Sequence, residues 1–219
     1  MVRRNAPEPP AAIRRSASAA DIVLNVMSAY AAKGSSLSFA ALAGARHFQE
    51  WRHYPQDDAF DANHLTGFYY HAHARAERPA DEHGHFHVFA RTPKGFHHLA
   101  GISLNATGWP TRLFLTNQWV TGEHWITADQ IAPMVDRFSC VVHGRLAPVS
   151  RWITQIIYLY QKDILRLHQQ KDAWLNQQTV IGKTLGSRRQ VREKALQSKT
   201  HHVLAEVPVD LAHDLKTIL

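Results

Sequence analysis

The chain has 219 residues, of which 45% are apolar and one is a cysteine, Cys140. This size is enough for one globular domain, while a single cysteine excludes an intrachain disulfide framework and is typical of a protein in a reducing cytoplasm, where we expect Cys140 to be a buried, unreactive thiol. No apolar run approaches the ~20 residues that cross a bilayer, so we expect no membrane span.

The formal net charge of +7 is concentrated near the two ends of the chain. Residues 1–20 hold four arginines against one glutamate, and residues 183–200 hold six basic side chains against Glu193, so the rest of the chain sums to about −1. A nucleic-acid-binding domain would instead carry its basic residues on a folded face. We therefore expect solvated ends, with weak, non-specific docking on nucleic acid or an acidic protein as the alternative.

The N-terminal part of the chain predicts a tail followed by two helices. Residues 1–17 are basic, lack the apolar segment of a secretory signal and are expected to be disordered. Capping residues and apolar periodicity predict a helix over about 19–33, ended by Gly34, and a second helix over 38–51. Pro55 and the acidic residues behind it predict a loop.

From residue 66 onward the apolar period changes to two, which is the period of a strand. Short turns rich in glycine and proline separate the alternating segments, as in an antiparallel meander. Four strands are expected, over residues 66–74, 82–91, 96–106 and 111–120.

Helices are expected after these strands. Thr127 opens a capping box for a helix to about residue 144, and a broad apolar stripe predicts a longer helix over 150–179. The predicted fold class is α+β: N-terminal helices, a four-stranded antiparallel meander, and C-terminal helices packed on one sheet face. We expect one domain over 18–182, followed by a basic connector and a C-terminal helical segment over 183–219.

Five histidines alternate along the first two expected strands. They are His71 and His73 in "YYHAHA", and His83, His85 and His87 in "EHGHFHVFAR". Alternate residues of a strand share a face, and the natural hairpin register sets His71 opposite His85, with His73 opposite His83. The same register sets Tyr69 opposite His87. Facing side chains have Cβ atoms about 4.5–5.5 Å apart, so their imidazoles can converge on one ion.

This pattern predicts a site for a divalent transition metal, because clustered imidazoles repel one another when protonated and give a strand no intrinsic advantage. Imidazole suits Fe, Zn and Cu alike, so the metal identity stays open. Glu77 can fold back toward the site from its loop, and Glu82 can reach it only if a bulge precedes the strand. A histidine-lined organic or haem pocket and a purely structural cluster are the alternatives. Neutral imidazole binds metal, so release is expected below about pH 6.

Two resemblances to known families accompany these motifs. "HAHARAE" followed by Gly84 resembles the first half of the cupin metal motif, and "PKGFHH" resembles part of its second half, although the leading glycine is too close and the closing asparagine is absent. The cupin resemblance implies four ligands: His71, His73, Glu77 and His98. The strings "HYPQDD", "YYHAH", "EHGHFH" and "TNQWVTGE" resemble an uncharacterised bacterial family over about residues 20–175, which implies one domain and no particular chemistry.

Further polar residues are candidates for chemistry at the histidine face. Tyr69 and Glu123 are predicted proton donors or acceptors, and Asn117 and His124 are predicted to bind a substrate or cofactor. A second group, rich in acids and histidine, predicts a lid or a metal-bridging loop. Its members are His53, Asp57, Asp58, Asp61 and His64.

Together these patterns predict a mononuclear metalloprotein in which three of the five histidines hold the ion. The predicted activity is that of a non-haem enzyme acting on a small molecule by oxygen-using or Lewis-acid chemistry. The alternative is a non-catalytic metal- or haem-binding accessory protein that docks through its basic ends. The sequence contains no phosphate-binding glycine loop and no G-x-S-x-G elbow, so kinase and nucleotide-binding functions are not indicated.

Overall fold

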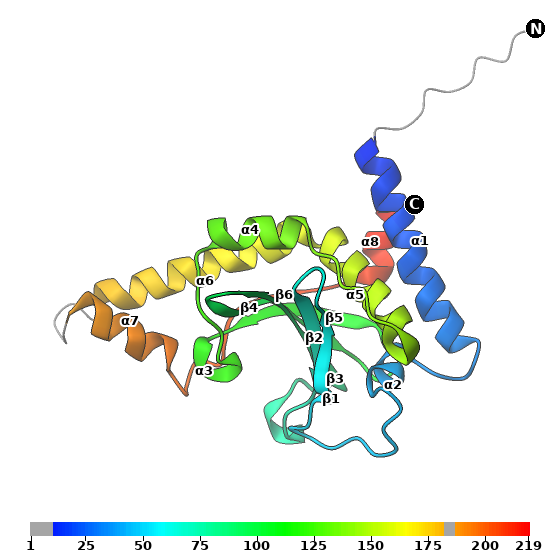
Figure 1. The fold of residues 1–219 in the computed structure, drawn as a ribbon, viewed down its shortest axis with the longest axis horizontal. Helices are drawn as coiled ribbons and strands as arrows, with labels where there is room; N and C mark the ends of the chain where they lie inside the picture. The colour runs from blue at the N-terminus through cyan, green and yellow to red at the C-terminus, as the bar shows by residue number, and fades with distance from the viewer. Residues whose placement is uncertain (1–10, 182–186) are drawn as a thin grey trace, which may run out of the picture.

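The computed structural model describes residues 11–181 and 187–219 and arranges them around one antiparallel sheet (Figure 1). The sheet has six strands in chain order. They are β1 (Tyr54–Asp61), β2 (Thr66–His71), β3 (Gly84–Thr92), β4 (Gly95–Leu104), β5 (Pro110–Thr116) and β6 (Val203–Pro208). The α+β class is therefore confirmed, and β2 to β5 are the predicted meander, but the expected number of four strands is too low.

The two additional strands lie at the two edges of the sheet. β1 was expected to be a loop because it contains Pro55 and several aspartates, which are depleted in strands but are tolerated at an edge. It pairs with β2 through an irregularity between Tyr54 and Ala59. β6 was expected to be part of a helical segment, and it pairs with β5, with Ala205 opposite Leu115.

Eight helices occur within the described residues. They are α1 (Ala11–Ala31), α2 (Leu37–Ala41), α3 (Gln118–Thr121), α4 (Ala128–Asp136), α5 (Ala147–Leu159), α6 (Gln161–Ile181), α7 (Arg188–Leu196) and α8 (Leu211–Ile218), with short 3-10 turns η1 (Arg75–Glu77) and η2 (Gly144–Leu146). Across these two described ranges, no helix combines the length and apolar character that a membrane span requires.

Several helix boundaries differ from those expected. α1 begins at Ala11, so residues 11–17 are helical, and only residues 1–10 of the expected tail lie outside the described residues. α2 has five residues because the chain turns at Ala43 and Gly44, both at positive φ. The long helix expected over 150–179 is divided into α5 and α6 at Tyr160. The capping box at the start of α4 is present, but this helix ends at Asp136.

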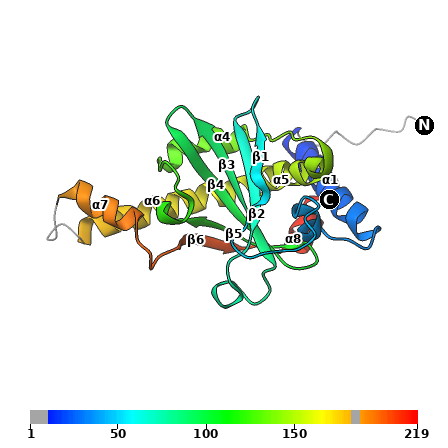
Figure 2. The ribbon, with the colours of Figure 1, turned by 60° about the horizontal axis from the view of Figure 1, so that its bottom comes forward.

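Helices α4, α5 and α6 cover one face of the sheet, which Figures 1 and 2 show from two directions. Phe86 and Val88 of β3 are fully buried on this side, and the Phe86 ring lies 6.3 Å from that of Trp152 in α5. Burial of each large apolar side chain contributes about 1.5–3 kcal/mol, so this layer stabilises the core. Cys140 is buried as predicted, and burial raises the pKa of its thiol to about 11.

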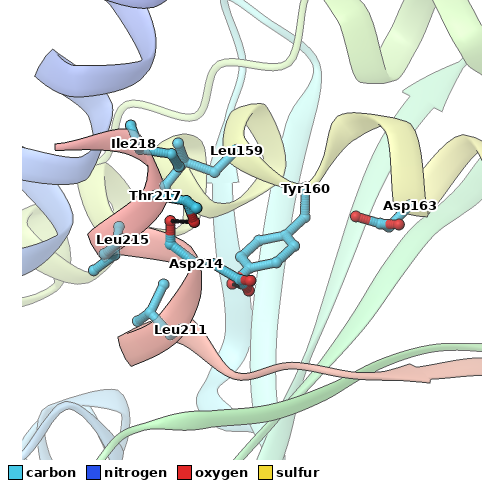
Figure 3. A pocket seen from close by; sticks show the side chains of 8 residues that line it. All are labelled: Leu159, Tyr160, Asp163, Leu211, Asp214, Leu215, Thr217 and Ile218. Carbon is cyan, nitrogen blue, oxygen red and sulfur yellow. Dashed lines mark hydrogen bonds between the residues drawn. The ribbon is translucent and has the colours of Figure 1, made fainter.

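α8 closes the junction between α5 and α6 (Figure 3). The Tyr160 hydroxyl donates to Asp214 Oδ2 at 2.6 Å, and Leu211 and Leu215 are buried beside this bond. Burial, followed by the neighbouring Asp214, raises the pKa of Tyr160, so its phenol stays a protonated donor. The hollow of ≈ 250 Å³ between these helices contains no histidine. The residues that line this hollow join α8 to α5 and α6.

Candidate metal centre

Three histidines are buried together on the sheet face opposite α5 and α6. His71 ends β2, and His85 and His87 lie in β3, with His71 paired with His85 and Tyr69 paired with His87 as predicted. One ligand nitrogen from each histidine lies within 4.8 Å of those of the other two. The ring centroids are 4.5 to 5.0 Å apart. This cluster can hold a metal ion.

The Nε2 atoms of His71, His85 and His87 are all buried, and none has a hydrogen-bond partner in the described parts of the chain. A buried polar atom without a partner costs about 1–3 kcal/mol, so three of them in one place indicate a site that a ligand completes. Tetrahedral bonds of ~2.0–2.1 Å place ligand nitrogens about 3.3 Å apart, which small rotations of the rings would reach. The donor set therefore fits an imidazole-binding metal.

Glu82 fixes the orientation of His85. Its Oε1 accepts a hydrogen bond from His85 Nδ1 at 2.8 Å, and its Oε2 accepts from Ser103 at 2.6 Å and from Arg112 at 3.2 Å. Burial disfavours the carboxylate, but these hydrogen bonds and the charge of Arg112 prevail and hold the pKa of Glu82 at about 2. A proton on Nδ1 leaves the Nε2 lone pair of His85 free for a metal. Glu82 precedes β3, which begins at Gly84, so strand alternation does not govern it.

His98 occupies the equivalent place behind His87. A hydrogen bond of 2.9 Å joins His87 Nδ1 and His98 Nε2, and His98 lies at the irregularity between β3 and β4. Burial lowers the pKa of both histidines, so both rings are neutral. The backbone N–H of His98 donates to Glu123, which forms an ion pair with Lys171 of α6, and both members of the pair are buried.

His73 lies beside the cluster, just beyond the end of β2. Its ring is 5.1 Å from that of His71 and 5.2 Å from that of His85, and it stacks on Trp51 at 4.6 Å. Partial burial, followed by the charge of His85, lowers the pKa of His73 to about 4. His73 is thus at the rim of the site.

His83 is directed away from the cluster, and its predicted pairing with His73 does not form. Its Nδ1 shares a hydrogen bond of 2.8 Å with the Tyr70 hydroxyl, and its ring stacks on Phe48 at 4.7 Å. His83 precedes β3, so the alternation that places His85 and His87 does not extend to it.

Tyr69 is at the cluster. Its ring lies 5.0 Å from that of His87 and 5.4 Å from that of His71, and His53 stacks on its other side at 3.8 Å. Burial, followed by the charge of Asp58, raises the pKa of Tyr69, so the phenol keeps its proton. His53 itself is hydrogen-bonded to Asp58 at 2.9 Å.

The other predicted residues lie outside the cluster. Asn117 caps α3 by accepting from Val120 N, and His124 is exposed, with its carbonyl accepting from His97. The predicted acidic group does not form one cluster. Asp61 pairs with His64, Asp58 pairs with His53, and Asp57 is exposed. The ligand set implied by the cupin resemblance is not brought together: Glu77 is exposed in η1 and His98 bonds His87.

A cavity of ≈ 70 Å³ lies against two of the three histidines, His85 and His87. Phe114 forms part of its wall, with its ring 5.2 Å from that of His85. Gly101 makes room for this ring, since a Cβ at that position would lie 2.4 Å from it. Thr116 of β5 also lines the cavity. These neighbours come from strands and loops distant in sequence, and histidine alternation does not identify them.

A family profile described as a domain of unknown function (DUF6969) matches residues 17–209. The chain belongs to this family. The predicted membership of an uncharacterised family is therefore confirmed. No curated protein and no solved structure matches the chain. The family description states no activity, so the chemistry has to be inferred from the site.

Proposed function

We propose that the protein binds one divalent transition-metal ion through Nε2 of His71, His85 and His87 and acts on a small molecule at that ion. The observation that carries this proposal is the convergence of three buried histidines, each with a ligand nitrogen within 4.8 Å of the others and each with an Nε2 atom that has no hydrogen-bond partner among the residues described. The Nδ1 atoms of His85 and His87 are already engaged, which directs their Nε2 atoms to the ion.

The number of ligands favours catalysis over a structural role. Structural zinc sites are closed by four protein ligands, whereas catalytic sites keep a position open. Here two of the three proposed ligands, His85 and His87, line a cavity, and so does His73. A bound divalent ion supplies Lewis acidity or redox chemistry at the open position.

Two protein groups have proposed roles beside the ion. Tyr69, a protonated phenol packed against His87, is the proposed proton donor. Glu123 is better suited to holding the backbone of His98 than to exchanging protons with a substrate, because it is buried in an ion pair with Lys171.

The competing functions have less support. Pockets for larger organic ligands measure ~300–1,000 Å³, so a cavity of ≈ 70 Å³ disfavours haem. A metal carrier would use the same ligands but needs no space beside the ion. Docking through the basic ends has less support because one of their basic side chains, the exposed Arg192, is engaged over the Trp125 ring at 4.1 Å. We also propose that the protein is located in the cytoplasm, a reducing compartment in which the free thiol of Cys140 would stay reduced.

Elemental analysis tests the proposal directly. Protein without a histidine tag, produced in media supplemented with Fe, Zn or Cu, should contain about one metal ion per chain. The His71→Ala/His85→Ala double variant should lose it. His83→Asn is the matched control, since His83 belongs to the same motif and Asn retains an acceptor for Tyr70. Metal-free protein from every medium, or full retention in the folded double variant, overturns the proposal.

A further inference from the structure

We propose that the cavity beside the three histidines is a subsite for a small carboxylate, held between the metal ion and the hydroxyl of Thr116. This inference rests on the proposed metal site. Thr116 is 2% exposed and lines the cavity together with His85 and His87. Its Oγ1 is buried and has no hydrogen-bond partner in the described ranges 11–181 and 187–219.

The geometry of β5 places the Thr116 side chain on the face that lines the cavity. Alternate residues of a strand share a face, and Arg112, Phe114 and Thr116 all line the cavity. Phe114 packs against His85 and His87 from this face. A buried hydroxyl without a partner is destabilising, so an oxygen atom of a ligand is the expected partner of Thr116.

The charges around the cavity favour an anion once a metal is bound. Arg78 and Arg112 are balanced by Glu77 and Glu82 among the lining residues, so a divalent ion leaves the cavity positive. Arg112 is not itself the anion-binding group, because its nitrogens already bond Ser103, Glu82 and Glu206. The remaining positive groups are the ion and Arg78, whose Nε is buried without a hydrogen-bond partner in the described residues.

The size of the cavity limits the size of the anion. One water molecule needs about 10–15 Å³ of a cavity volume of this kind, so ≈ 70 Å³ has room for a group of roughly five heavy atoms. A small carboxylate such as acetate fits this space, with one oxygen toward the metal and the other toward Thr116, whereas a phosphate ester has at least six heavy atoms and fits less well. Glu77 and His202 line the cavity and are exposed, so a ligand can enter past them.

Acetate binding to the cobalt-loaded, full-length protein tests this inference. Cobalt content is measured first by elemental analysis, and the visible spectrum of bound Co²⁺ is then followed during titration with acetate, with inorganic phosphate as the comparison. We expect acetate to change the spectrum and to bind at least about ten-fold more weakly to Thr116→Val, which loses the hydroxyl. Thr116→Ser, which keeps it, should bind acetate as the parent does.

Thr121→Val is the matched control, because Thr121 also has a buried hydroxyl without a partner within the described chain but does not line the cavity. Its acetate affinity should be unchanged. If cobalt binds but acetate leaves the spectrum unchanged, if phosphate binds more tightly than acetate, or if Thr116→Val binds acetate like the parent, the carboxylate subsite is wrong and the metal site stands. Absence of bound cobalt overturns both.

Discussion

Glu82 determines which nitrogen of His85 is available to a metal. Its carboxylate accepts a hydrogen bond from His85 Nδ1 at 2.8 Å and is itself held by Ser103 and Arg112. With a pKa of about 2 it stays charged at neutral pH, since the hydrogen bonds and Arg112 outweigh the effect of burial. A charged acceptor behind an imidazole raises the basicity of the opposite nitrogen, so Glu82 strengthens the ligand as well as orienting it.

Replacement of Glu82 by Gln should therefore weaken metal binding about ten-fold, because Gln still accepts a hydrogen bond but lacks the charge. Competition with a chelator of known affinity measures this change. Glu77→Gln removes a carboxylate from the same cavity wall without a contact to a ligand and should have little effect. Equal affinities in both variants would contradict the role of Glu82.

Two of the three clustered histidines, His71 and His87, stay neutral in the folded protein far below the ordinary pKa of imidazole. Burial, followed by the charges of neighbouring histidines, lowers the pKa of His71 to about 2, and burial lowers the pKa of His87 well below its ordinary value. In the unfolded chain these groups take up protons near pH ~6.5. With respect to these histidines, the folded protein therefore has its full stability above about pH 6.5 and loses stability as the pH falls below that value. For a histidine whose pKa is shifted as far as that of His71, the free energy of unfolding at pH 5 is lower by about 2 kcal/mol.

We accordingly expect metal to be retained at pH 5, lower than the pH of about 6 that free imidazole suggests. Protons compete little with the ion in the folded state, so release should coincide with unfolding as pH is lowered. Dialysis at steps from pH 7 to pH 4, with metal content and circular dichroism measured on the same samples, checks this. Loss of metal near pH 6 from a protein that keeps its fold would refute it.

The sequence allowed the ligands to be predicted better than their partners. Alternation places His85 and His87 on one face, and the hairpin register then pairs His71 with His85. The pattern stops at the strand end, which is why His83 was assigned wrongly to the same face. His98 was linked to the site only through the cupin resemblance, and its bond to His87 depends on a register shift between strands that periodicity does not reveal.

At the scale of elements, the packing of β4 on β5 supports the histidine face. Gly101 lies opposite Phe114 in the β4–β5 pair, and the Phe114 ring covers the position that a Gly101 side chain would occupy. That ring then packs against His85 and His87 at centroid distances of 5.2 and 5.8 Å. The absence of a side chain in one strand thus positions ligands in its neighbour.

Gly101→Ala should lower the free energy of unfolding by about 1–3 kcal/mol and weaken metal binding, because the added methyl displaces Phe114. Urea denaturation and chelator competition give the two quantities. In the Gly101→Ala/Phe114→Leu double variant the smaller side chain frees space, and part of the lost stability should return. A stable single variant with unchanged metal affinity would show that Phe114 does not position the ligands.

Prediction of the elements succeeded where local patterns were strong. β2 to β5 alternate clearly, and the capping box marks the start of α4. β1 and β6 were missed because their edge positions accept proline and charged residues, and because each is held by backbone pairing to a neighbouring strand rather than by its own apolar pattern.

In the whole molecule, the C-terminal segment joins the sheet, the cavity and the helical layer. β6 pairs along β5, and its first residue, Val203, lines the cavity together with the preceding His202. α8 then packs on the helical side through Leu211, Leu215 and the bond from Tyr160 to Asp214. Stability and the candidate site therefore depend on this segment in different ways.

Two truncations should separate these roles. Removal of residues 210–219 deletes α8 and should lower the free energy of unfolding by roughly 4–7 kcal/mol, from two buried leucines and one hydrogen bond, while metal binding persists. Removal of residues 199–219 also deletes β6, leaves the β5 edge unpaired and opens the cavity, so we expect aggregation or loss of metal. Thermal melts and metal content of soluble protein measure both effects. Loss of metal from the folded shorter truncation would show that α8 also supports the site, and full retention in the longer one would show that β6 does not complete it.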